Sequence, residues 1–541
     1  MKGDFSRVTF DPRHHYSQVF LQQGRVTLDA DPNEQGAILL HVLRTMARDL
    51  FGPYGGPVDH AGFALSLPSV PAGATPKLAF SAGRYYVDGI LCETEGGDYA
   101  SQPHHRPAPP NGNDPGADPL RRWLETRSTE DRRFWVYLDV WERHVTAVEQ
   151  PWLREVALGG PETCSRAQVV WQIRSLELEA ILATFKQRLE TLQIRLKNTK
   201  DERERAGIER WIKRIEDDMA ALDGRGDGNG NGCAAPLDAL RRFDLPELAA
   251  RIDPGHRVDD PCVMSPESGY RGAENHLYRV EIHRGGFGAQ ASFKWSRDNG
   301  SVLAAWLSSA GGRIRLGNTR GFAADAWVEL TDDDDDLQGR PGELRRILGV
   351  DGDELVLDRA PDKQIGAGAK ARRWDQVERA DAPLTGEGAV PVGQATASDP
   401  NWIDLEDGVQ VRFAPDREYR SGDYWQFAAR VATGQLEWRN DDQGEASFQA
   451  PRGIEHHYAP LGGIGLENGV PTIFPCTCEV HPVNTCGLLG RRLQGERDIV
   501  RDPAGRAEPQ PAPAAPPVAK GDTPVAKPRT RGTKTPVEPK P

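Results

Sequence analysis

Apolar residues near the start of the chain recur with the period of a helix. Between residues 37 and 51 they occupy one helix face, at Ile38, Leu39, Val42, Leu43, Met46 and Leu50. Gly52-Pro53 follows directly, and this pair ends a helix. The pattern predicts a polar, extended opening followed by one helix over residues 37–51.

From about residue 61 the pattern changes to short apolar runs separated by turn residues, which is typical of strands. One such run, at 134–141, predicts a long strand. Turns that need a positive φ, and therefore predict β-hairpins, lie at Asp88-Gly89 and Asp298-Asn299-Gly300. Short strands at this spacing continue to residue 463 and predict antiparallel sandwich or barrel domains.

A helical period returns between these β regions. One apolar set contains Leu178, Ile181, Leu182, Phe185, Leu189, Leu192 and Leu196, and a second contains Ile208, Trp211, Ile215, Met219 and Leu222. Asn198 interrupts the register, and Thr199-x-x-Glu202 has the form of a capping box. The break predicts an antiparallel helical hairpin, a coiled-coil arm. One continuous helix is the alternative, because neither Gly nor Pro intervenes before Gly207.

The chain is therefore expected to be mainly β with α insertions, an α+β fold. Its predicted parts are a docking segment with one helix at 1–60, the first part of a β-domain at 61–174, the helical arm at 175–224, a Gly/Asn-rich linker with a short helix near 237–251 at 225–260, the second part of the β-domain at 261–320, a sandwich or barrel domain at 321–463, a Cys-containing extension at 464–500 and a disordered Pro/Ala/Lys-rich tail at 501–541.

The distribution of charge along the chain makes some classes of binding partner unfavourable. The formal net charge is −13, while residues 501–541 hold eight Lys/Arg against four acids, which leaves −13 − (+4) = −17 for residues 1–500. A protein body with this much negative charge is expected to repel nucleic acid and anionic lipid. The sequence shows neither an apolar signal-peptide core nor a run of about 18 apolar residues. Seven cysteines suit a reducing compartment, so synthesis in the cytosol is expected.

The sequence contains no common catalytic signature. Gly-x-Ser-x-Gly, Gly-x-x-x-x-Gly-Lys and His-Glu-x-x-His are absent. The expectation is a protein without enzymatic activity and without a cofactor. An envelope-polymer hydrolase is the alternative, because many active sites have no local motif.

Two segments could hold a metal. Thiolates and an imidazole that could surround zinc lie at Cys476, Cys478, His481 and Cys486. Cys-x-Cys is tighter than the usual zinc spacing, so unligated cysteines are favoured. Oxygen donors that partly match a calcium loop lie at Asp227, Asn229, Asn231 and Asp238. A flexible connector is favoured there, because the twelfth position is the shorter Asp and Pro236 stiffens the loop.

Other polar clusters have simpler explanations. The acidic run 332–336 is expected to be a solvated turn that keeps a β edge from pairing, rather than a cation site. The doublets His14-His15, His104-His105 and His456-His457 receive no role. Arg25, Asp29, Asp31 and Asn33 could pair charges across a subunit contact, but a polar network at the N-terminus of the first helix is the favoured interpretation.

Several blocks resemble an uncharacterised domain family found in gene clusters of extracellular contractile injection systems and related phage-tail-like particles. The opening of the chain carries the resemblance at Met1-Lys2-Gly3-Asp4-Phe5, 22–26, 28–31 and 33–35, and later blocks carry it at 83–89, 140–146, 155–163, 277–283, 293–301 and 453–461. It covers about residues 1–463. The opening and the hairpin at 85–89 are also similar to phage baseplate and tail-fibre proteins.

The resemblance implies a structural or adaptor component of a contractile particle. Its partners would be baseplate, tube, sheath or fibre proteins, it would be oligomeric in the assembly, and a released particle would carry it out of the cell. No catalytic residue is carried over. A surface-recognition module that binds carbohydrate is the alternative, since aromatic faces of the 13 Trp and 11 Tyr stack on sugars.

Overall fold

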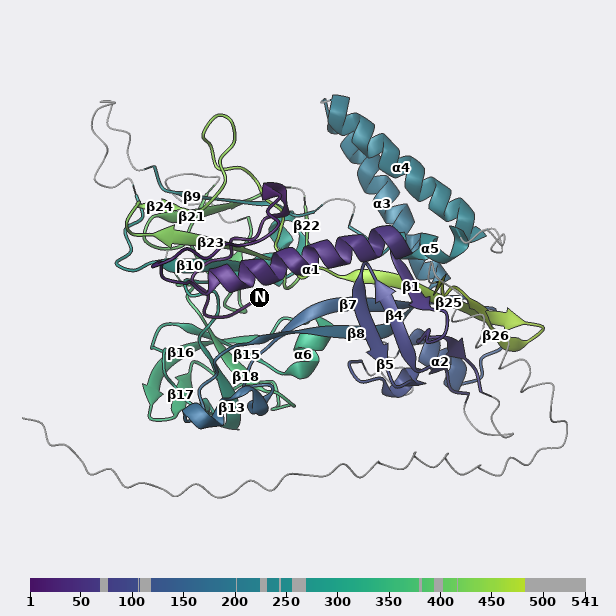
Figure 1. Cartoon of the computed structure of the whole chain (residues 1–541), viewed down its shortest axis with the longest axis horizontal. Coiled ribbons are helices and arrows are strands. Elements are labelled where there is room, and N and C mark those ends of the chain that lie inside the picture. The colour runs from purple at the N-terminus through teal and green to yellow at the C-terminus, as the bar shows by residue number, and fades with distance from the viewer. Residues whose placement is uncertain are drawn as a thin grey trace, which may run out of the picture. The chain divides into compact units, whose positions relative to one another are not determined.

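The N-terminal helix begins earlier than its apolar pattern indicates. In the computed structural model, α1 runs from Ala30 to Phe51 (Figure 1). Asp29 occupies the N-cap, and the Asp31 carboxylate accepts a 2.9 Å hydrogen bond from the backbone N–H of Leu28. A proline at residue 32 is tolerated, because the first N–H groups of a helix have no intrahelical acceptor. Gly52, at φ +82°, ends the helix as predicted.

The structure describes residues 1–68, 76–105, 107, 118–200, 202–223, 231–242, 245–254, 269–378, 382–393, 402–415 and 417–481. The fold is mainly β, with several antiparallel sheets and a few helices, which confirms the predicted fold class. The tail at 501–541 lies outside the described residues. Within the described ranges, no helix is long and apolar enough to cross a membrane.

The first β region contains two four-stranded sheets and one three-stranded sheet around a shared apolar core. The predicted hairpin at Asp88-Gly89 is confirmed, with φ +47° and +80° at the two turn residues. The first four-stranded sheet contains β1 (Tyr54–Pro57), β4 (Gly83–Val87), β5 (Ile90–Thr94) and β27 (Glu479–Val480), and the second contains β26 (Val470–Pro475), β25 (His457–Glu467), β7 (Phe134–Val145) and β8 (Arg166–Glu177). The three-stranded sheet contains β2 (Leu65–Ser66), β3 (Ala79–Phe80) and β6 (Gly97–Asp98). Helix α2 (Pro119–Glu125) belongs to the same region.

The helical arm follows β8 without a loop. It consists of α3 (Leu178–Asn198) and α4 (Glu202–Asp223), joined by a break after Asn198, and α5 (Asn231–Asp238) packs at its base (Figure 1). The predicted hairpin is therefore confirmed, and the continuous-helix alternative is wrong. The apolar sets expected from the period form one core between the helices.

The prediction of a short helix near 237–251 is wrong. Helix α5 ends at Asp238, and residues 248–252 form strand β9 (Leu248–Ile252), which pairs with β21 (Val409–Phe413) over five residues. Leu and Ala favour helices in isolation, but this segment lies where a sheet lacks a strand. Its first three residues are buried, and tertiary pairing overrides the local propensity.

A two-sheet sandwich follows the arm. One sheet has five strands, and its partner sheet has three; apolar residues of both form one core. The first contains β19 (Val390–Pro391), β12 (Ser292–Ser296), β10 (His276–Arg284), β23 (Tyr424–Arg430) and β24 (Gln435–Leu436), and the second contains β20 (Ile403–Asp404), β21 and β9. A small ribbon pairs β11 (Gly286–Phe287) with β22 (Glu418–Tyr419).

A closed six-stranded barrel is inserted between β12 and β19. Its strands, in order around the barrel, are β13 (Leu303–Ala310), β14 (Arg313–Leu316), β17 (Glu354–Leu357), β16 (Glu343–Asp351), β15 (Trp327–Thr331) and β18 (Lys370–Trp374). Helix α6 (Asp333–Gln338) follows β15. The barrel and the sandwich each use residues on both sides of the boundary expected at residue 320. Short 3-10 helices lie at Pro12–His14, Tyr99–Ser101, Pro151–Leu153, Val156–Leu158 and Gly288–Gln290.

Candidate functional site: a charged cavity and an apolar helix face

The first two residues of the chain line a cavity together with residues of sandwich and barrel strands. The carbonyl oxygen of Met1 accepts hydrogen bonds from Arg279, Asn299 and Gln426, at 3.3, 3.2 and 3.0 Å. The Met1 amine donates to the Tyr424 hydroxyl at 2.6 Å. The Asn299 side-chain amide also donates to the carbonyl oxygen of Gly3 at 2.9 Å. The chain start is thus held by groups that follow it by more than 270 residues.

The turn predicted at Asp298-Asn299-Gly300 is present, but the hairpin predicted around it is wrong: β12 before the turn pairs with β10 and β19, and β13 after it pairs with β14 and β18. This turn, which leads from the sandwich into the barrel, holds the chain start. Asn299 has φ +50°, is fully buried, and bonds the backbone of Met1 and Gly3 through its side chain. Its backbone carbonyl accepts from the N–H of Gly3 at 3.3 Å. Asparagine suits both tasks, because it tolerates positive φ and carries an amide donor. One turn therefore redirects the chain and anchors its start.

Charged residues reach the cavity because two sheets have a second buried face. In β10, Tyr278, Val280 and Ile282 enter the sandwich core, while alternate residues point the other way. The barrel strands β15 and β18 repeat this alternation around their own core. The buried charged residues of these strands that line the cavity are Arg279, Glu281, His283, Lys294, Glu329, Lys370 and Arg372.

Glu281 is the centre of one ion network. Its carboxylate contacts Lys2 at 2.9 Å, Arg279 at 2.7 Å and Lys294 at 3.3 Å. Burial alone would raise the pKa of Glu281, but these three cations outweigh burial and hold it well below its usual value. Lys294 also pairs with Glu329, to which Trp374 donates at 2.8 Å. Every charge in this network has an opposite neighbour, the condition under which buried ions are tolerated.

A second network joins β7 to the barrel. Lys370 contacts Glu149 at 2.7 Å and Asp336 at 2.5 Å. Arg143 of β7 contacts Asp333 and reaches Asp336 at 3.4 Å. Burial would raise the pKa of Glu149 and of Asp336, but the neighbouring cations lower both to about 2. These ions connect the first β region to the barrel across the cavity.

The acidic run 332–336 is not the solvated turn that the sequence favoured. Asp332 caps α6, accepts from the backbone N–H of Asp335, and forms a capping box with it. Lys363 contacts the carboxylates of both at 2.8 Å. Four acidic residues in the first turn suit the positive end of the helix. The run therefore builds a helix that delivers Asp333 and Asp336 to Arg143.

The second candidate feature is the outer face of α1. Ile38 is buried, and Arg44 forms a two-pronged ion pair with Glu142 of β7 at 2.8 and 3.0 Å, which fixes the helix to the body. An adjoining face is exposed: Leu39, Leu43, Met46 and Leu50 are 53, 55, 50 and 69 % exposed. Further exposed apolar residues nearby in sequence are Val8, Tyr16, Phe20, Leu21, Val26, Leu28, Leu40, Val42 and Phe51. We call Leu39, Leu43, Met46 and Leu50 the α1 seam.

The polar network expected at the start of the helix is observed for two of its four residues. Asp29 accepts a 2.9 Å hydrogen bond from the N–H of Ser6, and Asp31 accepts from Leu28. Thr9 donates to Glu34 at 2.6 Å, so the opening segment is also tied along the helix. The other two residues named for a subunit contact, Arg25 and Asn33, are exposed.

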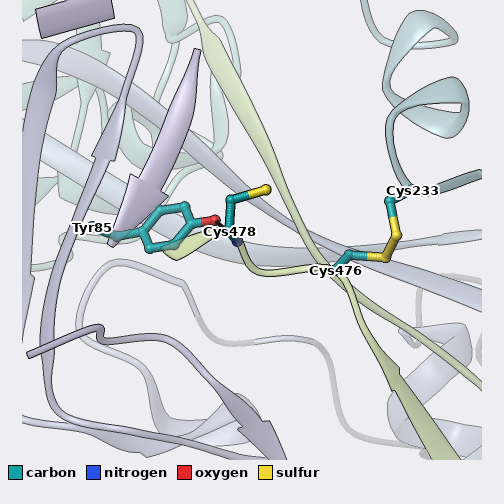
Figure 2. The surroundings of a disulfide bond; sticks show 4 residues. All are labelled: Tyr85, Cys233, Cys476 and Cys478. Atoms are coloured by element: carbon teal, nitrogen blue, oxygen red, sulfur yellow. Dashed lines mark hydrogen bonds between the residues drawn. A yellow bond between two sulfur atoms is a disulfide. The ribbon is translucent and has the colours of Figure 1, made fainter. Parts of the chain in front are cut away.

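One cysteine of the predicted zinc set forms a disulfide. Cys476 is bonded to Cys233 of α5, so it does not offer the thiolate that a zinc site needs, and the expectation that it is a free thiol is wrong (Figure 2). Cys478 is an exposed free thiol whose backbone N–H donates to the Tyr85 hydroxyl at 3.1 Å. His481 is exposed beside Glu479, and Cys486 lies outside the described residues. The parts of the chain that are described contain no cluster of three or more metal-ligating side chains.

The calcium candidates are divided in a similar way. Asp227 and Asn229 lie outside the described residues, whereas Asn231 begins α5. Asp238 pairs with Arg214 at 2.6 Å and with Arg241 at 3.1 Å. Its charge is therefore already compensated by the helical arm. Among the histidine doublets, His456 contacts Asp139 at 2.7 Å and His457 contacts Asp88 at 2.9 Å, which ties β25 to β7 and to the first hairpin.

The fold and its site define a mainly β protein in which a sandwich, a barrel and a helical arm surround a charged cavity that holds the chain start. The chain belongs to the family of unknown function DUF6519, whose profile matches residues 1–541. The chain thus belongs to a domain family of unknown function, as the resemblance implied, and the match also includes the residues after 463 that were expected to lie outside it. No curated protein matches the chain.

One solved structure, titled "Crystal structure of TssK", matches at 10% identity and a TM-score of 0.15, over 76% of this chain and 99% of that chain. A likeness of this size carries no argument about fold or function.

Proposed function

We propose that this protein is a structural or adaptor component of a phage-tail-like contractile particle, without enzymatic activity, and that it binds a neighbouring subunit through the α1 seam. The observation that carries the proposal is the concentration of exposed apolar side chains. Of the 29 large apolar residues exposed in the described part of the chain, 13 lie within the first 51 residues. Concentrated apolar surface of this kind marks interaction sites.

The spacing of the seam favours a helix as its partner. Leu39, Leu43, Met46 and Leu50 follow one another at steps of four, three and four residues. This is the 3.5-residue repeat by which two helices interdigitate. Leu40 and Val42 flank the seam and are about half exposed, which widens the contact. An amphipathic helix of another particle subunit has the shape and the chemistry to cover it.

The seam is presented on a fixed support. Arg44 binds Glu142, Thr9 binds Glu34, and the N–H of Val19 donates to Gln35 at 2.8 Å. These contacts use the polar positions of α1, so they orient the helix without using its apolar face. A helix that is already oriented loses less conformational freedom on binding, which favours affinity.

The carbohydrate-binding alternative has less support. Eight of the 13 tryptophans are buried in cores, and the remaining five include only one that is largely exposed, Trp152 at 73 %. Sugar recognition needs accessible aromatic faces. A glycan array with reproducible hits that Trp152→Ala abolishes would revive this alternative.

The test is co-purification. Tagged full-length protein is expressed in cells that assemble the particle, and captured proteins are identified by mass spectrometry. We expect baseplate, tube, sheath or fibre proteins with the native chain and their loss with the double variant Leu43→Glu/Leu50→Glu. The matched control is Leu307→Glu/Leu348→Glu, whose residues lie on the barrel and are 54 and 55 % exposed. Native protein that is absent from purified particles and monomeric in light scattering would refute the proposal.

A further inference from the structure

The cavity around the chain start contains more positive than negative side chains. Its volume is about 260 Å³. The cationic residues that line it are Lys2, Arg44, Arg143, Arg279, Lys294, Arg340, Lys370, Arg372 and Arg452, and the anionic residues are Glu142, Glu149, Glu281, Glu329, Asp335, Asp336 and Glu455. Nine cations line the cavity beside seven anions, and two of the cations, Arg143 and Arg340, have further acidic partners, Asp333 and Asp334, just outside the lining. Cations are concentrated here inside a body that carries a formal charge of −17 over residues 1–500.

Arg372 accounts for much of the imbalance. It is 7 % exposed, and its Nη1 donates to the carbonyl oxygen of Gly300. Within the described residues it forms no ion pair, although Glu149, Asp336, Glu329 and Glu281 act on it from a greater distance. A buried guanidinium ordinarily has a carboxylate or another anion in contact. Its other donors are therefore directed at a site that the chain itself does not fill.

Three more nitrogen atoms of the cavity wall lack a partner among the described residues. They are Arg143 Nε, His144 Nε2 and His283 Nδ1, and each is buried. Burial lowers the pKa of His144 to about 3 and that of His283 to about 4, so both rings are neutral at pH 7 and keep one N–H each. Buried polar atoms almost always have a partner, so these three nitrogens leave the hydrogen-bonding capacity of this cavity wall incompletely used.

We propose that the cavity binds a small multivalent oxyanion of the phosphate class. An oxyanion accepts several hydrogen bonds at once, and it would give the Arg372 guanidinium the anionic partner that the described residues do not place in contact with it. One water molecule needs about 10–15 Å³ of such space, so 260 Å³ accommodates phosphate or pyrophosphate with some hydration. The site is independent of the α1 seam, and neither proposal needs the other.

The anion would act on the segment that opens the chain. Lys2 and the Met1 amine line the same cavity, and burial lowers the pKa of each. A negative charge beside them favours their protonated forms and strengthens their contacts with Glu281 and Tyr424. Binding should therefore stabilise the folded protein and hold its first residues in place.

The experiment measures the melting temperature and binding heat of the full-length protein in inorganic phosphate, pyrophosphate and chloride, at matched ionic strength and pH 7.5. We expect a saturable rise in melting temperature with phosphate or pyrophosphate and none with chloride. Arg372→Met should raise the half-saturating phosphate concentration by at least about tenfold, which is the loss of affinity expected when one charge-assisted hydrogen bond is removed. His144→Phe, which removes an unpartnered nitrogen without changing net charge, serves if Arg372→Met fails to fold.

Arg313→Gln is the matched control, because Arg313 is exposed on the barrel and pairs with Asp351 outside the cavity. It should leave phosphate binding unchanged. Two results would overturn the proposal: phosphate and pyrophosphate acting no differently from chloride, or an equal response in the native protein, Arg372→Met and His144→Phe. The second result would show that the anion binds elsewhere on the surface.

Discussion

The first 51 residues combine two regions in which the usual distribution of residue types is inverted. The opening residues place Lys2 and the Met1 amine in the interior, among buried carboxylates and guanidinium groups. Helix α1 places Leu39, Leu43 and Leu50 on the surface. Buried charge is tolerated where each ion has a partner, and exposed leucine is expected where another molecule covers it. The cavity thus holds the chain start, while the seam remains available.

The largest expected effect comes from removing one carboxylate of the cavity. Glu281→Ala leaves Lys2, Arg279 and Lys294 without their shared partner, and breaking a buried ion network in this way costs about 3–5 kcal/mol. The free energy of unfolding from urea titration measures the loss. The control Glu354→Gln removes an exposed partner of Arg313 and should cost less than about 1 kcal/mol. Equal losses would remove the distinction between cavity and surface.

Removing the disulfide is expected to lower the stability of the body without changing the binding of a partner at the seam. Cys233→Ser releases a link between residues 243 apart in sequence and should lower the free energy of unfolding by about 2–4 kcal/mol. Neither cysteine lines the cavity. We therefore expect capture of partner subunits to persist in this variant, and its loss would mean that the arm takes part in binding. Mass spectrometry under non-reducing conditions verifies the Cys233–Cys476 bond.

A smaller effect is expected from acid. His144 faces Arg372, Arg279, the Met1 amine and Glu149, and burial lowers its pKa to about 3. Because the unfolded chain binds a proton at about pH 6.5 and the folded chain does not, stability is full above pH 6.5 and falls as the pH drops toward 3. His144→Phe should flatten the fall between pH 6.5 and 4.5. The buried carboxylates, with pKa values near 2, weaken the fold further only below about pH 4.5.

The smallest effect on stability is expected at the seam. Leu43→Glu/Leu50→Glu changes exposed side chains that support no core, so the free energy of unfolding should change by no more than about 0.5 kcal/mol. The same variant should lose partner capture. Calorimetry on the isolated protein, run beside the co-purification, separates the two readouts. A strong destabilisation would show that the seam packs within its own chain.

Sequence reasoning found the elements whose signal is local. The apolar sets from Leu178 to Leu222 predicted the helical hairpin, and Asp88-Gly89 predicted its β-hairpin, because each depends on neighbours in sequence. The α1 pattern predicted the helix, but the same pattern has one buried residue, Ile38, and an exposed seam. Periodicity shows that a face is apolar and does not show whether the chain itself covers that face.

The elements that were missed depend on distant partners. Strand β9 forms because β21, about 160 residues later, supplies its hydrogen bonds. The cavity escaped notice because its charged residues alternate with core residues in several separate strands. That alternation was visible at Arg279, Glu281 and His283, and charges opposite an apolar face usually indicate solvent. Only the docking of sandwich against barrel turns that second face into an interior, and no local pattern encodes it.

Because residues late in the chain bind its first residues, the opening segment can be anchored only late in synthesis. Tyr424 and Gln426, which bind the backbone of Met1, leave the ribosome more than 420 residues after it. At roughly 5–20 residues per second, 423 residues separate Met1 from Tyr424 by roughly 20–85 seconds. Until then α1 has no completed body to orient it. A nascent chain therefore cannot present a correctly placed seam.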